Sequence, residues 1–322
     1  RASDLSALLD SMGQGIQTIK AANEGIESIT EFVQQAKSVA NQARDEANKV
    51  ASSSGMYDST KIEAATKFQL SVTYNGETKS VEVTAPKAAA TGVEMAAKIQ
   101  EELEKLTFGT PATALGDDVF EVTYEDDAFK MTSANGEEAK ISFEVGGAKM
   151  DATAGNANRV KAISQFNDIL DQIDQLAKDS GYKGVNLLGG TDQSLTVIFN
   201  EDRSSNLTIQ GVDASTKGLD ISRVTNWGSN TNIDASIEEV EDAINELRNM
   251  ASEFGNNYSI VQNREDFTEN LINVLEEGSD KLVLADMNEE SANMLALQTR
   301  QQLGVNSLSL ASQAAQAVLK LF

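Results

Sequence analysis

Few residues in this sequence could carry chemistry, because its 322 residues include no cysteine and no histidine. That composition excludes disulfides, thiol nucleophiles, the usual zinc sites and imidazole general bases. Two carboxylate clusters remain, Asp117-Asp118 and Glu125-Asp126-Asp127. They could bind calcium or act as an acid/base pair, but neither has the D-x-[DN]-x-[DN]-G spacing of oxygen ligands. Solvated acidic loops are the simpler interpretation, so we predict no catalytic residue, no metal site and no enzyme.

Two glycine pairs and the single tryptophan are the other candidates for a binding site. Gly146-Gly147 and Gly189-Gly190 are not followed by the G-x-x-x-x-G-K of a phosphate-binding loop, so we expect turns and no cofactor. Trp227 lies in a polar loop and could stack on a ligand. A plug at a domain edge is the favoured interpretation.

The charge of the chain excludes two classes of partner. The formal net charge is −24, and such a field repels phosphate backbones and anionic lipid headgroups. No apolar run reaches the roughly 18 residues that a membrane span needs. We therefore expect no nucleic-acid partner and no membrane partner.

The elements that surround these residues are mostly helical. Prolines occur only at Pro86 and Pro111, so long helices are allowed at both ends of the chain. Apolar residues at helical spacing predict a long helix over 3–51, and Ser52 to Gly55 reads as a linker. A change to a period of two predicts a β-hairpin around Asn75-Gly76, at 68–83. A helix over 91–106 and strands at 119–124, 128–132 and 140–145 complete a small α+β insertion.

Helical spacing returns after the insertion. We predict a helix over 158–178 that Gly181 caps, and a β-hairpin element within 185–221. A second long helix is predicted over 234–278, with Asp234 or Ser236 as its N-cap and Glu239 three residues beyond Ser236.

The last segment, 286–322, is the strongest candidate for a functional surface. Met294, Val305, Leu308, Leu319 and Phe322 follow helical spacing, and a second set widens the apolar stripe, namely Leu295, Leu303 and Leu310. Leaving such a helix in water would forfeit on the order of 10 kcal/mol, an upper estimate before entropy. These eight residues are therefore predicted to form an assembly interface.

The predicted fold is mainly α: a long helical coiled-coil or bundle core with a β-hairpin element and a small inserted α+β domain. Four parts are expected. They are an N-terminal core helix (1–55), the inserted variable domain (56–150), the rest of the helical core (151–280) and a C-terminal assembly helix (281–322).

Three stretches, in order along the chain, resemble the bacterial flagellin family. The segment 286–322, with Leu297 to Val305 reading L-Q-T-R-Q-Q-L-G-V, resembles the flagellin C-terminal helix in its alphaproteobacterial form. The segment 171–188 is similar to the family's E-I-D-x-I and F-N-G-x-x-L-L element, and 16–43 is similar to its N-terminal core helix. The sequence departs from the family in two ways: the insertion lies between the first two core helices, and the extreme N-terminal segment is missing. We therefore expect an N-terminally truncated flagellin.

The resemblance implies a structural subunit of the flagellar filament, whose terminal helices pair into a coiled-coil layer that drives self-assembly for motility. It implies secretion through the flagellar export apparatus to the extracellular filament. The implied partners are other flagellin subunits, the filament cap, junction proteins and an export chaperone. Two alternatives stay open: a hook–filament junction protein, and a cell-surface homologue whose inserted domain binds a polysaccharide or a host surface. A concave aromatic patch in 60–145 would favour the second.

One departure concerns innate immunity. Flagellins that the animal Toll-like flagellin receptor detects carry Q-R-x-R-E-L on the first core helix, whereas the matching stretch here, 33–38, reads V-Q-Q-A-K-S. Gln34 and Ala36 stand where the arginines would be, and Lys37 follows them. Losing an arginine anchor at an interface commonly costs about 2 kcal/mol or more. The resemblance thus predicts a poor receptor agonist.

Overall fold

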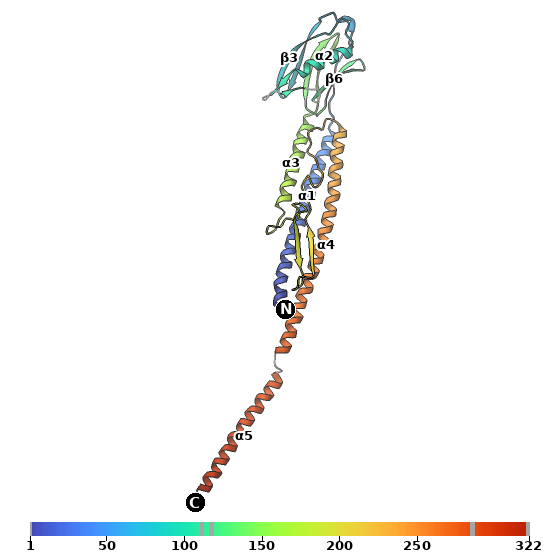
Figure 1. Cartoon of the computed structure of the whole chain (residues 1–322). Helices are drawn as coiled ribbons and strands as arrows, with labels where there is room; N and C mark the ends of the chain where they lie inside the picture. Colours follow the sequence, from blue (N-terminus) through green and yellow to red (C-terminus); the bar gives the residue numbers. More distant parts are fainter. Residues whose placement is uncertain (1, 110–112, 116–118, 284–286, 320–322) are drawn as a thin grey trace. The chain divides into compact units, whose positions relative to one another are not determined.

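The computed structural model describes residues 2–109, 113–115, 119–283 and 287–319 (Figure 1). Its long helices and small antiparallel sheets confirm the predicted fold class. The chain divides into two compact units. Unit 1 comprises Arg1–Gly15, Val197–Leu207 and Ile260–Phe322, and unit 2 comprises Ile16–Thr196 and Thr208–Ser259. Two long helices, α1 (Ala2–Asp45) and α4 (Asn230–Val283), contribute to both units.

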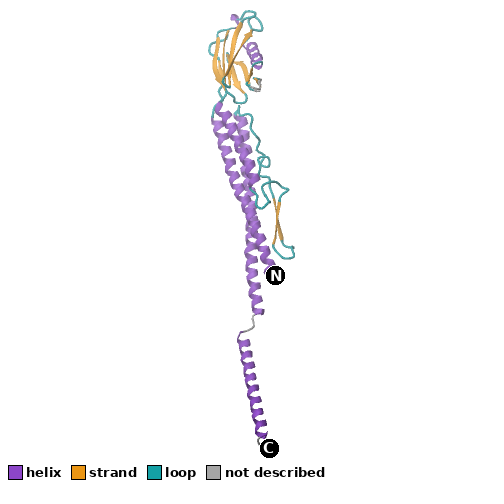
Figure 2. Ribbon diagram, turned by 90° about the vertical axis from the view of Figure 1, so that its left-hand side faces the viewer, coloured by secondary structure: helices purple, strands orange, loops and turns teal. Residues whose placement is uncertain are grey.

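The helical part of unit 2 consists of α1 from Ile16, α4 as far as Ser259, and α3 (Ala157–Asp179), which run alongside one another (Figure 2). Each helix buries apolar residues at intervals of three, four or seven, as the helical repeat requires for a core-facing stripe. The fully or nearly fully buried members of these stripes are Ile19, Ile26, Ile29, Val33, Phe166, Leu170, Ile173, Val240, Leu247 and Phe254. The spacing of apolar residues in the sequence therefore predicted the helical core correctly.

The first helix ends earlier than predicted. It stops at Asp45, and Ala51–Ser52 form strand β1, so the predicted continuation to Ala51 is wrong. The Ser/Gly segment that follows, residues 52–55, forms backbone hydrogen bonds with strands far away in the sequence, so it is not a free linker. The Ser53 amide donates to the Phe129 carbonyl at 2.8 Å, and the Ser54 amide donates to the Lys149 carbonyl at 2.7 Å. Pairing with distant strands, which local spacing does not reveal, overrides the helical pattern here.

The α+β portion of unit 2 contains two sheets. One has the order β3-β2-β8-β9 and the other β1-β7-β6, all antiparallel. The bounds are β2 (Lys67–Tyr74), β3 (Glu77–Thr84), β6 (Phe120–Glu125), β7 (Ala128–Ser133), β8 (Ala139–Val145) and β9 (Ala148–Ala154). Isolated bridges Lys49↔Gly155 and Ser54↔Lys149 join the β1 segment to the β9 edge. The residues on either side of β1 therefore connect the two sheets.

Short elements complete this portion. Helix α2 (Gly92–Glu104) packs on β3 and β6, a 3-10 turn (Ser59–Lys61) follows β1, and β4 (Thr107–Phe108) pairs with β5 (Thr113–Ala114). Thr91 is the N-cap of α2 and forms a capping box with Glu94. The predicted helix, hairpin and three strands are all present. Asn75 and Gly76 have φ values of 51° and 79°, as the predicted type I′ turn requires. Strand β9 was not predicted, although residues 148–154 alternate between apolar and polar residues; three of its four apolar residues are alanines, which have a low strand propensity.

The residues that cap the C-terminus of α3 differ from the predicted ones. The C-terminus of α3 is capped by side chains, since the Ser180 hydroxyl donates to the Leu176 carbonyl (2.7 Å) and the Asn186 amide donates to the Ala177 carbonyl (2.8 Å). Gly181 is not among the residues with positive φ, so the left-handed glycine cap predicted there is wrong.

Helix α4 begins four residues before Asp234. The Asn232 amide donates to the Ser229 hydroxyl at 3.2 Å, so Ser229 supplies the cap. Asp234 instead pairs with Arg44, and the Ser236 hydroxyl accepts from the Trp227 indole at 3.1 Å. The predicted cap at Asp234 or Ser236 is therefore wrong, because tertiary partners on other segments use both side chains.

Between α3 and α4 the chain forms the predicted hairpin element, with β10 (Ser194–Ile198) paired to β11 (Asn206–Gln210). Helix α5 (Met287–Leu319) lies wholly in unit 1 and confirms the predicted C-terminal helix over its described residues.

Candidate assembly interface

Helix α5 is the most exposed element of the chain. Every side chain from Met287 to Ala317 is exposed, which contrasts with the buried stripes of α1, α3 and α4. Six of the eight predicted interface residues lie in this range: Met294, Leu295, Leu303, Val305, Leu308 and Leu310. Their exposed fractions run from 61% at Met294 to 77% at Leu308. Leu319 is the last residue of α5, but its side chain and the whole of Phe322 lie outside the described residues.

The apolar residues of α5 form two faces. With 3.6 residues per turn, Met294, Val305 and Leu308 fall within about 60° of one another around the helix axis. Leu303 and Leu310 fall on nearly the opposite side, about 160° away, with Leu295 at the border of their face. The predicted single wide stripe is therefore better described as two apolar faces, which we call face A (Met294, Val305, Leu308) and face B (Leu295, Leu303, Leu310). A helix that is apolar on opposite sides needs partners on both to leave water.

The C-terminal part of α4 extends this exposed surface within unit 1. Ile260, Phe267 and Val274 are exposed and lie seven residues apart, whereas Val261 and Thr268 beside them are buried. One heptad position thus carries three exposed apolar side chains, the pattern of a coiled-coil seam. These residues were not among the predicted interface residues, although their spacing of seven was visible in the sequence.

Of the two acidic clusters, the structure describes Glu125-Asp126-Asp127. Asp126 and Asp127 occupy the β6–β7 turn with φ values of 55° and 59°. Lys130 Nζ lies 2.6 Å from Asp126 Oδ2 and 3.6 Å from Glu125 Oε2, and the hydrogen bond from Lys130 lowers the pKa of Asp126. Asp117-Asp118 lies outside the described residues. Among the residues that the structure describes, no group of three or more acidic side chains is arranged to hold a metal ion.

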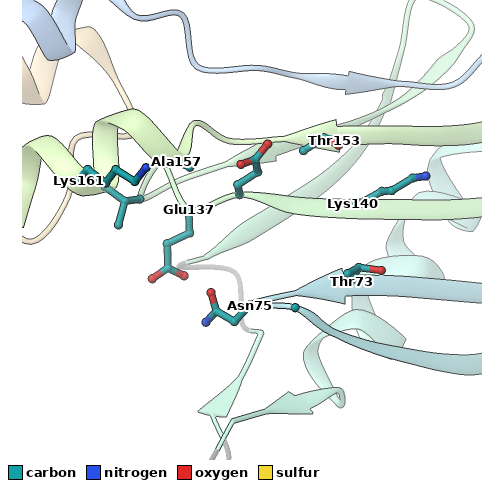
Figure 3. A pocket seen from close by; sticks show the side chains of 10 residues that line it. Thr73, Asn75, Glu137, Lys140, Thr153, Ala157 and Lys161 are labelled. Carbon is teal, nitrogen blue, oxygen red and sulfur yellow. The ribbon is translucent and has the colours of Figure 1, made fainter.

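A recess of about 490 Å³ lies between the β2–β3 turn and the start of α3 (Figure 3). Thr73, Asn75, Glu137, Lys140 and Lys161 are among the residues that line it, and each of their side chains is half-buried or exposed. Nearby Tyr74 donates its hydroxyl to Glu137, and burial together with this bond raises the pKa of the tyrosine. Charged side chains of both signs line the recess together with Ala157 and Val160.

The aromatic side chains of the α+β portion are core residues. Phe68, Phe108, Phe120, Phe129 and Phe143 are buried, and they pack edge-on or tilted against one another and against nearby tyrosines. Trp227 is fully buried as well, with its ring centroid 5.1 Å from that of Phe166. The favoured interpretation of Trp227 as a plug agrees with this position, and stacking on a ligand does not.

The stretch matched to the innate-receptor motif lies on α1 in unit 2. Gln34 is exposed, Ala36 is fully buried, and Lys37 Nζ lies 2.8 Å from Glu241 Oε1. A side chain at position 36 therefore points into the core in this register and could not reach a receptor. Weak receptor activation stays a prediction.

Among the described helices, none is long and apolar enough to cross a membrane.

Comparison with known proteins bears on the same end of the chain. Residues 237–322 match the bacterial flagellin C-terminal helical region. The chain is 31% identical over 180 residues to a flagellin of Brucella melitensis, which covers 52% of this chain and 64% of the relative. It is 29% identical over 175 residues to the flagellin FljK of Caulobacter vibrioides, covering 54% and 64%. With flagellin C of Rhizobium meliloti the identity is 43% over 86 residues, 27% of each chain.

The chain thus spans less than two thirds of the length of the first two of these relatives. All three come from alphaproteobacteria, as the amino-acid sequence of residues 297–305 suggested. The resemblance is therefore confirmed: residues 237–322 match the flagellin C-terminal helical region, in a chain similar to the flagellins of alphaproteobacteria.

Proposed function

We propose that this chain is a structural subunit of the bacterial flagellar filament and acts through self-assembly, without catalysis. The observation that carries the proposal is the exposure of faces A and B on α5, inside the segment that matches the flagellin C-terminal helical region. A polymer buries α5 in every subunit.

The two faces suggest how the polymer is held together. Face A and face B point in nearly opposite directions, so one partner helix cannot cover both. Burying a large aliphatic side chain stabilises by roughly 1.5–3 kcal/mol, which gives on the order of 10 kcal/mol for the six residues as an upper estimate. The seam at Ile260, Phe267 and Val274 would add a coiled-coil contact. Two different neighbours per helix favour a closed layer of many subunits over a dimer.

The finer parts of the proposal concern the other partners and the location. We propose export through the flagellar apparatus to the outside of the cell, and contact with the filament cap, junction proteins and an export chaperone. Support comes from the similarity to flagellins and from the composition, since a chain without cysteine needs no particular redox compartment.

The two alternatives are less well supported. A junction protein would share the C-terminal helix, but the relatives named above are flagellins. A binding module would need exposed aromatic side chains in the α+β portion, and the phenylalanines there are in the core.

Self-association of the full-length protein tests the proposal. We expect sedimentation velocity to show concentration-dependent growth to large species, and electron microscopy to show long filaments. Species that stop at a few subunits would favour a junction protein. A chain that stays monomeric at high concentration would contradict self-assembly through the residues present.

A further inference from the structure

Four segments of unit 2 meet where its α+β portion joins its helices. They are the connection from α1 to β1 (46–50), the loop between β7 and β8 (134–138), the first turn of α3, and the residues that precede α4 (226–230). Only the first segment and the β9–α3 connection cross the junction as continuous chain. Two covalent connections side by side would form a hinge, so the contacts of the other segments decide whether the junction is rigid.

Arg159, on the first turn of α3, is the centre of this junction. It is 2% exposed, and its guanidinium donates to four uncharged acceptors. Nε donates to the Glu46 carbonyl (2.8 Å), Nη1 to the Trp227 and Gly228 carbonyls (3.1 and 3.2 Å), and Nη2 to Asn230 Oδ1 (2.5 Å). The planar fork of an arginine suits such divergent acceptors, and a lysine ammonium cannot reproduce it. One side chain thereby ties together α3, the end of α1 and the start of α4.

Two asparagines extend this network into the α+β portion. Asn48 Nδ2 donates to the Ser133 carbonyl (2.9 Å) and to the Gly228 carbonyl (2.7 Å), so it bridges β7 and the segment before α4. Asn156 Nδ2 donates to the Ala47 carbonyl (2.8 Å), and the backbone N–H of Asn156 donates to the Gly136 carbonyl (2.7 Å). Both asparagines therefore donate hydrogen bonds to segments far from them in the sequence.

Backbone packing at the same place leaves no room for a side chain. A Cβ added at Gly228 would lie 1.9 Å from the Ala134 carbonyl oxygen, and one at Gly155 would lie 1.7 Å from the Glu137 carbonyl oxygen. The β7–β8 loop is thus held against both the segment before α4 and the end of β9. This loop supplies a third attachment that the covalent path of the chain does not.

We propose that Asn48, Asn156 and Arg159 form a junction latch that fixes the orientation of the α+β portion relative to the helices of unit 2. Without these three side chains, the junction keeps its two covalent connections and the backbone contacts of the β7–β8 loop, and it acts as a hinge. The recess between the β2–β3 turn and α3 supplies the room in which the α+β portion would move (Figure 3). The latch concerns the single chain and does not depend on the proposed role in a filament.

The absence of cysteine from the sequence allows a direct distance measurement. Ser80 on β3 and Ser164 on α3 are both exposed, and replacing both by cysteine places one spin label on each side of the junction. A second pair, Ser38→Cys with Ser164→Cys, reports on the helices alone. Pulsed electron spin resonance then gives the width of each distance distribution.

Two latch variants are compared with a matched control. Arg159→Lys keeps the charge and removes the fork, while Asn48→Ala removes two hydrogen bonds that span the junction. Loss of two such bonds raises the unlatched population roughly thirtyfold. Arg223→Lys makes the same chemical change at an exposed arginine that pairs with Asp171 on α3, away from the latch.

We expect both latch variants to broaden the Ser80–Ser164 distribution and to leave the Ser38–Ser164 distribution narrow. Arg223→Lys should leave both distributions as in the parent. If Arg159→Lys fails to fold, Asn48→Ala carries the test, because Asn48 is only half-buried. A Ser80–Ser164 distribution that stays as narrow as that of the parent in a folded latch variant would overturn the proposal.

Discussion

Replacing Leu308 on face A or Leu303 on face B by aspartate should abolish self-association and leave the fold of unit 2 intact. Leu308 is 77% exposed and Leu303 is 62% exposed, so neither side chain contributes much packing within the chain. Surface changes of this kind usually shift the free energy of unfolding by less than about 0.5 kcal/mol. The melting of unit 2 should therefore not change.

The effect on assembly should be large because both leucines would be buried in the polymer. Losing one buried leucine costs about 2 kcal/mol, and placing a carboxylate in an apolar contact costs roughly 3 kcal/mol more. The sum, about 5 kcal/mol per contact, corresponds to between three and four orders of magnitude in the association constant. Assembly should thus disappear at any concentration that can be reached in solution.

Sedimentation velocity over a wide range of concentration measures this effect, with circular dichroism melting as the check on folding. Asn293→Asp is the matched control, since it adds the same charge to an exposed position of α5 that lies between the two faces. Wild-type association by both leucine variants would refute the assignment of α5 as an interface. Loss in only one of them would leave one face without a role, and equal loss in Asn293→Asp would show that charge alone opposes assembly.

Four further outcomes are expected. Deleting the α+β insertion between Lys49 and Gly155, whose backbones already pair, should leave a cooperatively melting helical core, and loss of the cooperative transition in circular dichroism would sink this idea. Gly155→Ala should lower the free energy of unfolding in urea by about 3 kcal/mol or more, because φ is 89° and the new Cβ would overlap a carbonyl oxygen. The control Gly255→Ala lies on α4 with open space around it and should raise the free energy of unfolding by about 0.5–1 kcal/mol. The hydrogen bonds from Lys105 and Lys98 lower the pKa of Glu101 to about 2. The stability that the ionised Glu101 contributes is therefore present above the usual pKa of 4.5 and is lost as the pH falls towards 2. NMR titration of Glu101 should show a midpoint at about 2, and Lys105→Gln should raise that midpoint. The purified chain should activate the Toll-like flagellin receptor poorly in reporter cells, and activation at the concentrations that suffice for arginine-containing flagellins would show this prediction to be wrong.

Elements with local signals were predicted well from the sequence. The hairpin of β2 and β3 follows from period-two alternation around Asn75-Gly76, and both turn residues have the positive φ that such a turn needs. Helix α3 follows from apolar residues at helical spacing, and three of them, Phe166, Leu170 and Ile173, lie on its buried face. Signals of this kind depend on neighbours a few residues apart, so they can be read from the order of residues alone.

Elements that depend on distant partners were missed. Strand β1 exists because it lies between β7 and β9, and its own Ala-Ser sequence has no strand pattern. The caps of α3 and α4 were assigned to the wrong residues. Asp234 pairs with Arg44, far away in the sequence, and Ser236 accepts a hydrogen bond from the buried Trp227. Competition for a side chain between a local cap and a tertiary contact is decided only in three dimensions.

The sequence by itself determined that this chain is mainly helical, that chemistry based on cysteine or histidine is excluded, and that its C-terminal segment is an apolar helix of the flagellin type. The first two conclusions rest on the spacing of apolar residues and on composition, and the third rests on the resemblance of residues 286–322 to the flagellin C-terminal helix; folding changes none of these. The tertiary structure alone decided that α5 stays exposed on two faces while Trp227 and Arg159 are buried. The physical reason is that burial depends on which segments fill the space around a side chain, and in this chain those segments are more than sixty residues away from Arg159.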